Sequence, residues 1–228
     1  MTSIAANLQA VRARIAAACV AAGRAAESVQ LLAVSKTWPA ARVREAAAAG
    51  QRAFGENYVQ EAVEKAGELK DLDLEWHFIG PLQSNKTRPV AETFAWAHSV
   101  DRLKVAERLA AQRPPGHPPL QVCLQVNVSG EASKSGCAPQ QALELASAVT
   151  RLPNLRLRGL MAIPEPTTDL QRQQQQFALL RLTLERINAE PGFMLDTLSM
   201  GMTDDLEAAI MEGATMVRIG TAIFGKRE

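Results

Sequence analysis

Residues 31–39 read LLAVSKTWP, an apolar run that turns polar at Ser35 and is closed by Pro39. A short unbroken apolar run is typical of a strand buried on both faces, and proline ends it because proline lacks the N–H that a strand ladder needs. An open doubly wound sheet would place a glycine-rich loop directly after its first strand. Residues 31–39 contain no glycine, so they favour a parallel barrel, with the open sheet as the alternative.

Runs of the same kind recur along the chain, separated by segments with helical periodicity. The eight runs are QLLAVS (30–35), RAFG (52–55), WHFIG (76–80), FAWAHSV (94–100), LQVCLQVNV (120–128), LRLRGLMAI (155–163), MLDTLS (194–199) and TMVRIG (215–220). The proline-rich segment 113–120 falls inside this alternation and is interpreted as a loop. Alternating buried strands and helices build parallel sheets, so the sequence predicts an α/β fold: one (β/α)8 TIM barrel domain over residues 1–228.

Three helices carry specific expectations. An apolar stripe at helical spacing predicts an extra N-terminal helix that packs on the barrel rather than a transit peptide, and it consists of Ile4, Leu8, Val11 and Ile15. Asp101 is expected to cap the helix that follows it, and Thr203 the helix near residue 205. Both side chains can accept hydrogen bonds from the first backbone N–H groups of a helix.

Charge and cysteine content exclude several classes of protein. The chain has 25 Lys and Arg against 24 Asp and Glu, so no global field would gather nucleic acid or an anionic membrane. No apolar run reaches the ~18 residues of a membrane span. Three cysteines without ligand spacing indicate a reducing, cytoplasmic compartment and no structural disulfide. His77, His98 and His117 lack metal-ligand spacing, so no metal site is expected.

Small and polar residues collect where the last two expected strands end. In a (β/α)8 barrel the carboxyl ends of the strands share one rim, which carries the functional groups. Ser199 and Gly201 follow the seventh strand, and Gly220 and Thr221 follow the eighth. Small residues let backbone N–H groups approach an anion, and barrels often bind phosphate after strands seven and eight. These four residues therefore predict a phosphate site.

Lys36 stands at the end of an apolar strand on the same rim. Apolar surroundings disfavour the charged ammonium, which favours a nucleophilic amine able to form a Schiff base with a carbonyl compound. A reactive lysine facing a phosphate site indicates a phosphorylated aldehyde, for which pyridoxal phosphate is the candidate. Arg218, near the end of the eighth strand, is placed to donate to a pyridine nitrogen. A lysine that simply extends into solvent is the alternative.

Six segments closely resemble the pyridoxal phosphate homeostasis protein family, whose members look like the barrel domain of alanine racemase standing alone. They are LLAVSKTWP, FGENYVQEAVEK, WHFIGPLQSNK, NVSGEASKSG, RGLMAIP and LSMGMTDDLEAAIMEGATMVRIGTAIFG, and they extend over nearly the whole chain. The resemblance implies a protein that binds and buffers pyridoxal phosphate inside the cell, without an established catalytic reaction. It also implies apo-enzymes that depend on pyridoxal phosphate as transient recipients.

By this resemblance Lys36 carries pyridoxal phosphate as an internal aldimine. Asn57 is then expected beside the ring and Arg218 at the pyridine nitrogen. The implied phosphate contacts are Ser199, Gly201, Gly220 and Thr221. An arginine at the nitrogen holds it unprotonated, which weakens the ring as an electron sink and suits a holder of the cofactor better than a catalyst.

The resemblance also bears on the roles of three further residues, Lys65, Lys134 and Trp38. Lys65 and Lys134 match lysines that relatives use in cofactor transfer or secondary binding, although a solvated surface lysine is the favoured interpretation of both. Many relatives have a lysine where this chain has Trp38. A transfer role for that lysine therefore does not carry over.

A pyridoxal phosphate-dependent amino-acid racemase of low activity is the alternative function. Racemases of the similar barrel add a second, mostly β domain and use a tyrosine as the acid/base on the opposite face of the substrate. The one tyrosine here is Tyr58, expected on the opening turn of a helix. Because proton return on the second face then lacks an agent, we expect no catalytic residues. Without the pairing domain, we expect a monomer or weak homodimer.

Overall fold

The structure, a computed structural model that describes residues 3–130 and 135–225, is built around a closed parallel barrel. Its strands are β1 (Gln30–Val34), β2 (Ala53–Glu56), β3 (Glu75–Phe78), β4 (Trp96–Val100), β5 (Leu120–Gln125), β6 (Leu155–Met161), β7 (Thr197–Ser199) and β8 (Met216–Ile219). They follow one another around the barrel in chain order, and β8 closes the ring by pairing with β1. The predicted (β/α)8 barrel is confirmed.

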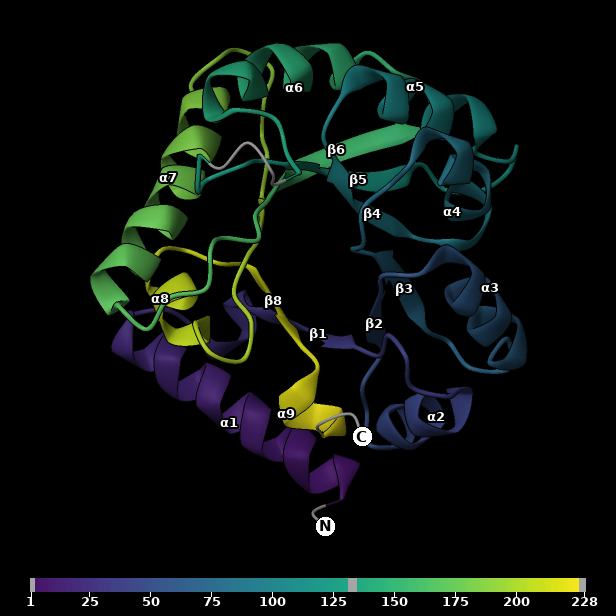
Figure 1. Cartoon of the computed structure of the whole chain (residues 1–228), viewed down its shortest axis with the longest axis vertical. Coiled ribbons are helices and arrows are strands. Elements are labelled where there is room, and N and C mark those ends of the chain that lie inside the picture. The colour runs from purple at the N-terminus through teal and green to yellow at the C-terminus, as the bar shows by residue number, and fades with distance from the viewer. Residues whose placement is uncertain (1–2, 131–134, 226–228) are drawn as a thin grey trace.

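Helices surround the barrel and separate its strands in the chain (Figure 1). They are α1 (Ile4–Ala21), α2 (Ala40–Ala48), α3 (Val59–Glu68), α4 (Thr87–Thr93), α5 (Leu103–Gln112), α6 (Ala142–Thr150), α7 (Leu170–Asn188), α8 (Leu206–Met211) and α9 (Thr221–Phe224). Residues 113–119 of the proline-rich segment form the loop between α5 and β5, as predicted, and Leu120 already belongs to β5. The last strand and the short helix α9 bring the end of the described chain back beside α1 (Figure 1).

Apolar side chains pack in two places, between the barrel and the helices and inside the barrel. The outer layer holds the large cluster, with Phe54, Phe78 and Phe177 among its fully buried members. Inside the barrel lie two small clusters, one around Leu32 and Met216 and one around Trp96, Cys123 and Met161. Polar side chains fill much of the remaining interior, so the barrel is a packed core that also carries buried hydrogen-bonding groups.

The predicted N-terminal helix is α1, and its apolar stripe faces the protein. Ile4, Leu8, Val11 and Ile15 are all buried, and α1 packs against α8 and α9 (Figure 1). By length and composition alone, with 18 residues and a mean hydropathy of 1.2, α1 also meets the criteria for a membrane span. The burial of its stripe is the pattern of a surface helix that faces a core.

Neither predicted helix cap occurs in the structure. The helix after β4 begins at Leu103 with Arg102 in the capping position, because the Asp101 carboxylate instead pairs with the Arg102 guanidinium at 2.7 Å. The helix after β7 begins at Leu206, because the Asp205 carboxylate accepts the Met202 N–H at 2.6 Å and folds residues 202–205 into a turn. The prediction for Thr203 was therefore wrong by two positions.

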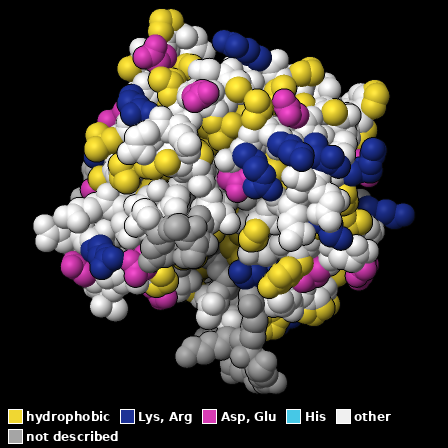
Figure 2. All heavy atoms as spheres, turned by 45° about the horizontal axis from the view of Figure 1, so that its top comes forward, with side chains coloured by type: hydrophobic (Ala, Val, Ile, Leu, Met, Phe, Trp, Pro, Cys, Tyr) yellow, Lys and Arg dark blue, Asp and Glu magenta, His cyan; other side chains and the backbone are white. Residues whose placement is uncertain are grey.

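The outer surface carries charges of both signs. Figure 2 shows acidic and basic side chains on one face, interspersed with apolar and neutral ones. This mixture matches the balance of 25 basic and 24 acidic residues in the chain. All three cysteines lie in the described part of the chain, where they are buried and free, as the sequence predicts.

Candidate functional site

A cavity of about 560 Å³ opens at the carboxyl ends of the strands. Five of the seven residues that the sequence predicts for cofactor binding line it, and they are Lys36, Asn57, Arg218, Gly220 and Thr221. The other lining residues are Val34, Trp38, Ile79, Ile163, Met202, Thr203, Asp204 and Gly225. The structure therefore brings an amine, a guanidinium and the loop after β8 together at one rim.

The loop that carries Lys36 is held on both sides of that residue. The Ser35 hydroxyl donates to Glu56 Oε1 at 2.6 Å, and the Thr37 N–H donates to Glu61 Oε1 at 2.5 Å. Thr37 has φ of 65°, in the left-handed region that side chains other than glycine rarely adopt. Such a conformation persists where surrounding contacts enforce it, and these two bonds do so beside Lys36.

Lys65 lies beneath this loop rather than on the surface. It is 3% exposed, and its Nζ donates to Glu56 at 2.6 Å, to Glu61 at 2.8 Å and to the Ser35 carbonyl at 2.9 Å. The interpretation of Lys65 as a solvated surface lysine was wrong, because this buried cluster takes it out of water. Burial raises the pKa of Glu56, while Lys65 and the Ser35 hydroxyl act in the opposite direction. Lys134 lies outside the described residues.

Arg218 is a buried cation that lines the cavity. Its NH1 group donates to the Ser199 carbonyl at 2.5 Å and to the Ser199 hydroxyl at 2.8 Å, and NH2 donates to the Ala162 carbonyl at 2.8 Å. A guanidinium has five N–H groups, so two remain without a partner among the described residues. Burial lowers the pKa of Arg218 to about 10, with Asp205 and Cys123 acting in the opposite direction. The side chain therefore stays charged at neutral pH and only donates hydrogen bonds.

Ser199 and Gly201, the other two predicted phosphate contacts, do not line the cavity. The Ser199 side chain is fully buried inside the barrel, between Arg218 and His98. Gly201 faces α8, where an added Cβ would lie 2.6 Å from the Cβ of Ala209, and its φ of 93° also requires glycine. Gly201 thus shapes the turn after β7, and Thr203 takes its place on the cavity wall.

Close backbone packing joins the loops after β2 and β3 at one edge of the cavity. A Cβ at Gly80 would lie 2.2 Å from the Asn57 carbonyl oxygen, so only glycine lets the loops after β2 and β3 meet. Asn57 Oδ1 is buried and has no hydrogen-bond partner among the described residues. A buried amide oxygen without a partner is rare in folded proteins and is consistent with a ligand donor at this position.

The polar pattern of the sequence missed the apolar residues that line the cavity. Ile79 directly follows β3 and Ile163 lies two residues after the end of β6, so their positions near strand ends were the signal that could have found them. Trp38 forms a third wall. Its ring stacks on Phe224 of α9 with centroids 6.1 Å apart, and the Arg42 guanidinium lies 5.7 Å from its centre.

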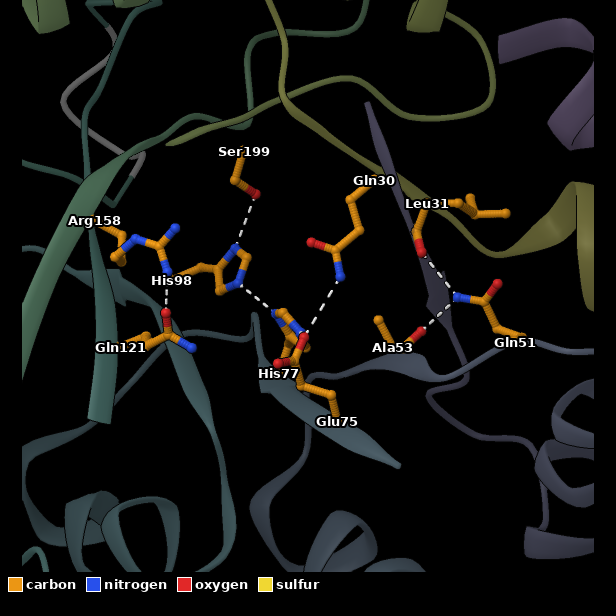
Figure 3. Close-up of polar contacts among 10 residues, drawn as sticks. All are labelled: Gln30, Leu31, Gln51, Ala53, Glu75, His77, His98, Gln121, Arg158 and Ser199. Atoms are coloured by element: carbon orange, nitrogen blue, oxygen red, sulfur yellow. Dashed lines mark hydrogen bonds and ion pairs between the residues drawn. The ribbon is translucent and has the colours of Figure 1, made fainter. Parts of the chain in front are cut away.

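The histidines of the barrel and the tyrosine stand outside the cavity lining. His77 and His98 are fully buried inside the barrel, where Figure 3 shows them in a line of hydrogen bonds between Glu75 and Ser199. Within residues 3–130 and 135–225, no group of three or more His, Cys, Asp or Glu side chains could hold a metal ion. Tyr58 precedes α3 and is 53% exposed.

Comparison with known proteins places this barrel in a class. The chain matches the family described as "Alanine racemase, N-terminal domain" over residues 3–228, so the fold is that of an alanine-racemase-type barrel. It is 67% identical over 228 residues to the "Pyridoxal phosphate homeostasis protein" of Pseudomonas aeruginosa, covering 100% of this chain and 97% of that protein. Identity to the protein of the same name from Escherichia coli strain K12 is 54% over 231 residues, covering 100% and 98%.

A solved structure extends the comparison. PipY of Synechococcus elongatus, described as having PLP bound, is similar with a TM-score of 0.85 and 41% identity, over 98% of this chain and 100% of that one. Identities this high over whole chains show common family membership and not only a shared fold. The chain belongs to the pyridoxal phosphate homeostasis protein family.

Proposed function

We propose that this protein binds pyridoxal 5′-phosphate in the cavity at the carboxyl ends of its strands and takes part in intracellular pyridoxal phosphate homeostasis. The observation that carries the proposal is the presence of Lys36 and the buried cation Arg218 on the walls of one cavity of about 560 Å³. Relatives that share 67% and 54% of their residues bear the name of that role, and PipY is described with PLP bound.

The donor set of the cavity fits the ring of this cofactor. The two unused N–H groups of Arg218 require an acceptor, and an unprotonated pyridine nitrogen is one. Apolar walls from Ile79, Ile163 and Trp38 suit the faces of an aromatic ring, and Asn57 offers a buried amide beside them. When bound, the cofactor supplies an aldehyde and an electron-accepting ring.

Lys36 is the residue that attaches the cofactor covalently. Its amine would hold the cofactor, and the cofactor would supply the aldehyde with which that amine can condense, with loss of water. The bonds from Ser35 and Thr37 to the two glutamates fix the backbone on both sides of Lys36, so they orient its side chain before the cofactor arrives.

The phosphate is placed against Gly220 and Thr221. The first N–H groups of α9 have no acceptor within the helix, and the Thr221 hydroxyl adds a donor. Gly220 keeps this loop close to β1, since a Cβ there would lie 3.1 Å from the Val34 carbonyl oxygen. The Asp204 carboxylate in the turn after β7 also lines the cavity and would repel a phosphate, which favours the loop after β8 for the phosphate.

The same residues favour a protein that holds and releases the cofactor over an enzyme that turns over a substrate. A guanidinium at the ring nitrogen does not give up a proton to it, so the ring remains a weak electron sink. Tyr58 is exposed and absent from the described cavity lining, so the racemase alternative is not favoured. We place the protein in the cytoplasm, as a monomer or weak homodimer, with apo-enzymes that need pyridoxal phosphate as transient recipients.

Reduction with borohydride tests this proposal directly. Purified protein is mixed with pyridoxal phosphate, its visible absorption is recorded, and the reduced product is digested and mapped by mass spectrometry. We expect one phosphopyridoxyl group on Lys36, lost in Lys36→Ala and retained in the control Lys70→Ala, which removes an exposed lysine. Labelling spread over surface lysines, or a visible band that survives Lys36→Ala, would show that the cavity is not the attachment site.

A further inference from the structure

Five side chains form a continuous line of hydrogen bonds through the barrel interior, from the amino end of β3 to the cavity. Glu75 Oε1 lies 2.8 Å from His77 Nε2, and His77 Nδ1 lies 3.0 Å from His98 Nε2. His98 Nδ1 lies 2.8 Å from the Ser199 hydroxyl, which lies 2.8 Å from Arg218 NH1. Figure 3 shows the members from Glu75 to Ser199. We call these five residues the Glu75–Arg218 chain.

The two ends determine the direction of every bond in this chain. A guanidinium only donates, so the Ser199 oxygen accepts from Arg218 and its own hydrogen is free to point to His98 Nδ1. A carboxylate only accepts, so His77 carries its proton on Nε2. A neutral His77 then accepts at Nδ1, and the bond to it requires His98 to carry its proton on Nε2. Every hydrogen bond therefore points toward Glu75. Arg218 donates to Ser199, Ser199 to His98, His98 to His77 and His77 to Glu75.

The three middle members of the Glu75–Arg218 chain are uncharged and shielded from water. His77, His98 and Ser199 have no exposed surface. Burial lowers the pKa of both imidazoles; for His98 the neighbouring His77 and Arg218 act in the same direction, while for His77 the Glu75 carboxylate opposes it. The Asp205 carboxylate raises the pKa of Arg218, whereas burial raises the pKa of the Cys123 thiol to about 12 and so keeps it uncharged at neutral pH. A neutral relay between a cation and an anion is therefore the state that the surroundings favour.

We propose that Glu75, His77, His98 and Ser199 are positioning residues for Arg218, which orient its guanidinium and couple the charge of Glu75 to the cofactor cavity. Ser199 Oγ and two carbonyls take three of the Arg218 N–H groups, which leaves two N–H groups available to the cavity that Arg218 lines. This inference rests on the proposed function in one respect, that Arg218 faces the cofactor ring.

Glu75, the end of the Glu75–Arg218 chain that is remote from the cofactor cavity, is accessible to water. The Glu75 side chain is 39% exposed and borders a second cavity of about 630 Å³ at the amino ends of the strands, together with Gln30 and Asp73. Gln30 donates to the same Glu75 oxygen at 3.4 Å. A change of charge at this mouth is therefore transmitted to Arg218 through groups that are themselves shielded from solvent.

Nitrogen NMR of the protein without cofactor tests the direction of the chain. With ¹⁵N-labelled histidine at neutral pH, His77 and His98 are each expected as neutral rings protonated on Nε2, assigned by the loss of one signal in His77→Gln and the other in His98→Gln. A ring protonated on Nδ1, or a doubly protonated ring, would overturn the proposal. This measurement needs no cofactor, so its outcome is independent of the proposed function.

A pH titration of the visible absorption of the protein with bound pyridoxal phosphate tests the coupling. Glu75→Gln keeps an acceptor oxygen but removes the negative charge, which makes the cavity more positive and disfavours a protonated Schiff base. We expect its titration midpoint to move to lower pH by ~0.3 unit or more. Asp73→Asn removes a carboxylate from the same mouth but not from the chain, and is expected to leave the midpoint unchanged.

The double variant separates the chain from a simple field effect. Ser199→Ala interrupts the chain next to Arg218, so it should shift the midpoint in the same direction, and adding Glu75→Gln should then shift it no further. Additive shifts, or equal shifts in Glu75→Gln and Asp73→Asn, would overturn the proposal. Absence of any visible band in the wild-type protein would instead count against the proposed function and leave the NMR result to decide the chain.

Discussion

Lys65 Nζ lies 2.6 Å from Glu56 Oε1, and both side chains are buried directly beneath the loop that carries Lys36. The same glutamate oxygen accepts from the Ser35 hydroxyl, and Glu61, the second partner of Lys65, accepts from the Thr37 N–H. The pair therefore does more than neutralise charge. It ties α3 to the two residues that flank the proposed attachment lysine.

Removing one member of this pair should damage stability more than removing both. We expect Lys65→Met to lower the free energy of unfolding by about 3–5 kcal/mol, because it leaves the Glu56 charge buried and uncompensated. The double variant Lys65→Met/Glu56→Gln should recover a large part of that loss. Urea unfolding of the protein without cofactor measures both, and a double variant no more stable than Lys65→Met would contradict the explanation.

Buried neutral histidines should make stability depend on pH. The pKa values of His77 and His98 are lowered in the folded protein, so below pH ~6.5 the unfolded chain binds more protons and stability falls with falling pH. His98→Gln removes one of the two histidines that bind a proton on unfolding. The free energy of unfolding should then vary less steeply with pH, by up to ~1.4 kcal/mol per pH unit.

The comparison between wild type and His98→Gln separates the contribution of His98 to the pH dependence of stability from the contributions of other titratable groups. Glu56 acts in the opposite direction, because its raised pKa makes its contribution fall as pH rises above the ordinary glutamate value, and it is present in both proteins. Urea unfolding at several pH values between 5 and 8 gives the two slopes. Identical slopes would mean that His98 is charged in the folded state, contrary to the direction of the hydrogen bonds.

The sequence predicted the barrel well because its information is local and repeated. Each of the eight apolar runs became a strand, since a parallel strand covered on both faces needs a short run of buried residues and little else. The apolar stripe of α1 was predictable for the same reason, because its four residues from Ile4 to Ile15 are repeated at helical spacing. Helix starts were predicted less well, because Asp101 and Asp205 each had a second partner nearby that competed for the carboxylate.

The site was only partly predictable, because a cavity wall depends on side-chain direction in three dimensions. Position at a strand end correctly brought Lys36 and Arg218 to one cavity, but it could not tell that Ser199 turns into the barrel toward His98. The line of hydrogen bonds from Glu75 joins residues up to 101 positions apart in sequence, so no local spacing signals it. Lys65 was missed as a buried residue because its partners Glu56 and Glu61 look like ordinary surface acids in the sequence.

Two threonines should distinguish where the phosphate lies. Thr221→Val removes a hydroxyl beside the loop after β8 and keeps the side-chain volume, so we expect roughly a tenfold weaker affinity for pyridoxal phosphate, about one hydrogen bond to a charged group. Affinity for pyridoxal, which has no phosphate, should be unchanged. Thr203→Val, in the turn after the neighbouring strand β7, lines the same cavity, serves as the matched control and should affect neither ligand.

Absorbance titration of each variant gives these affinities. A larger loss in Thr203→Val than in Thr221→Val would move the phosphate to the loop after β7, where the sequence had expected part of its site. Equal losses for pyridoxal and pyridoxal phosphate would mean that the Thr221 hydroxyl contacts another part of the ligand.

Gly201 should be required for stability and not for ligand contact. Gly201→Ala forces a side chain into positive φ and places its Cβ 2.6 Å from that of Ala209, and we expect a loss of about 2–4 kcal/mol. Gly23→Ala has a similar φ of 66° with nothing within 4 Å, so it measures the backbone term alone, about 1–2 kcal/mol. A loss in Gly201→Ala no greater than in Gly23→Ala, by thermal or urea unfolding, would mean that the turn after β7 moves to accept the methyl group.

Trp38 offers a test of what a second amine in the cavity would do. Its side chain lines the cavity two residues after Lys36 and stacks on Phe224, so Trp38→Lys should lower the free energy of unfolding by about 1–3 kcal/mol through lost aromatic packing. In the loaded protein the new amine lies on the same wall as Lys36 and should compete for the aldehyde. After borohydride reduction, mass spectrometry should therefore find the phosphopyridoxyl group on residue 38 as well as on Lys36.

The matched control is Trp38→Met, which loses the same stacking without adding an amine. It should show a comparable loss of stability with all of the label on Lys36. If Trp38→Lys also carries its label on Lys36 alone, the side chain at position 38 does not reach the aldehyde. A lysine at this position would then be unable to accept the cofactor from Lys36 directly, and release from the cavity would have to begin with water attacking the Schiff base.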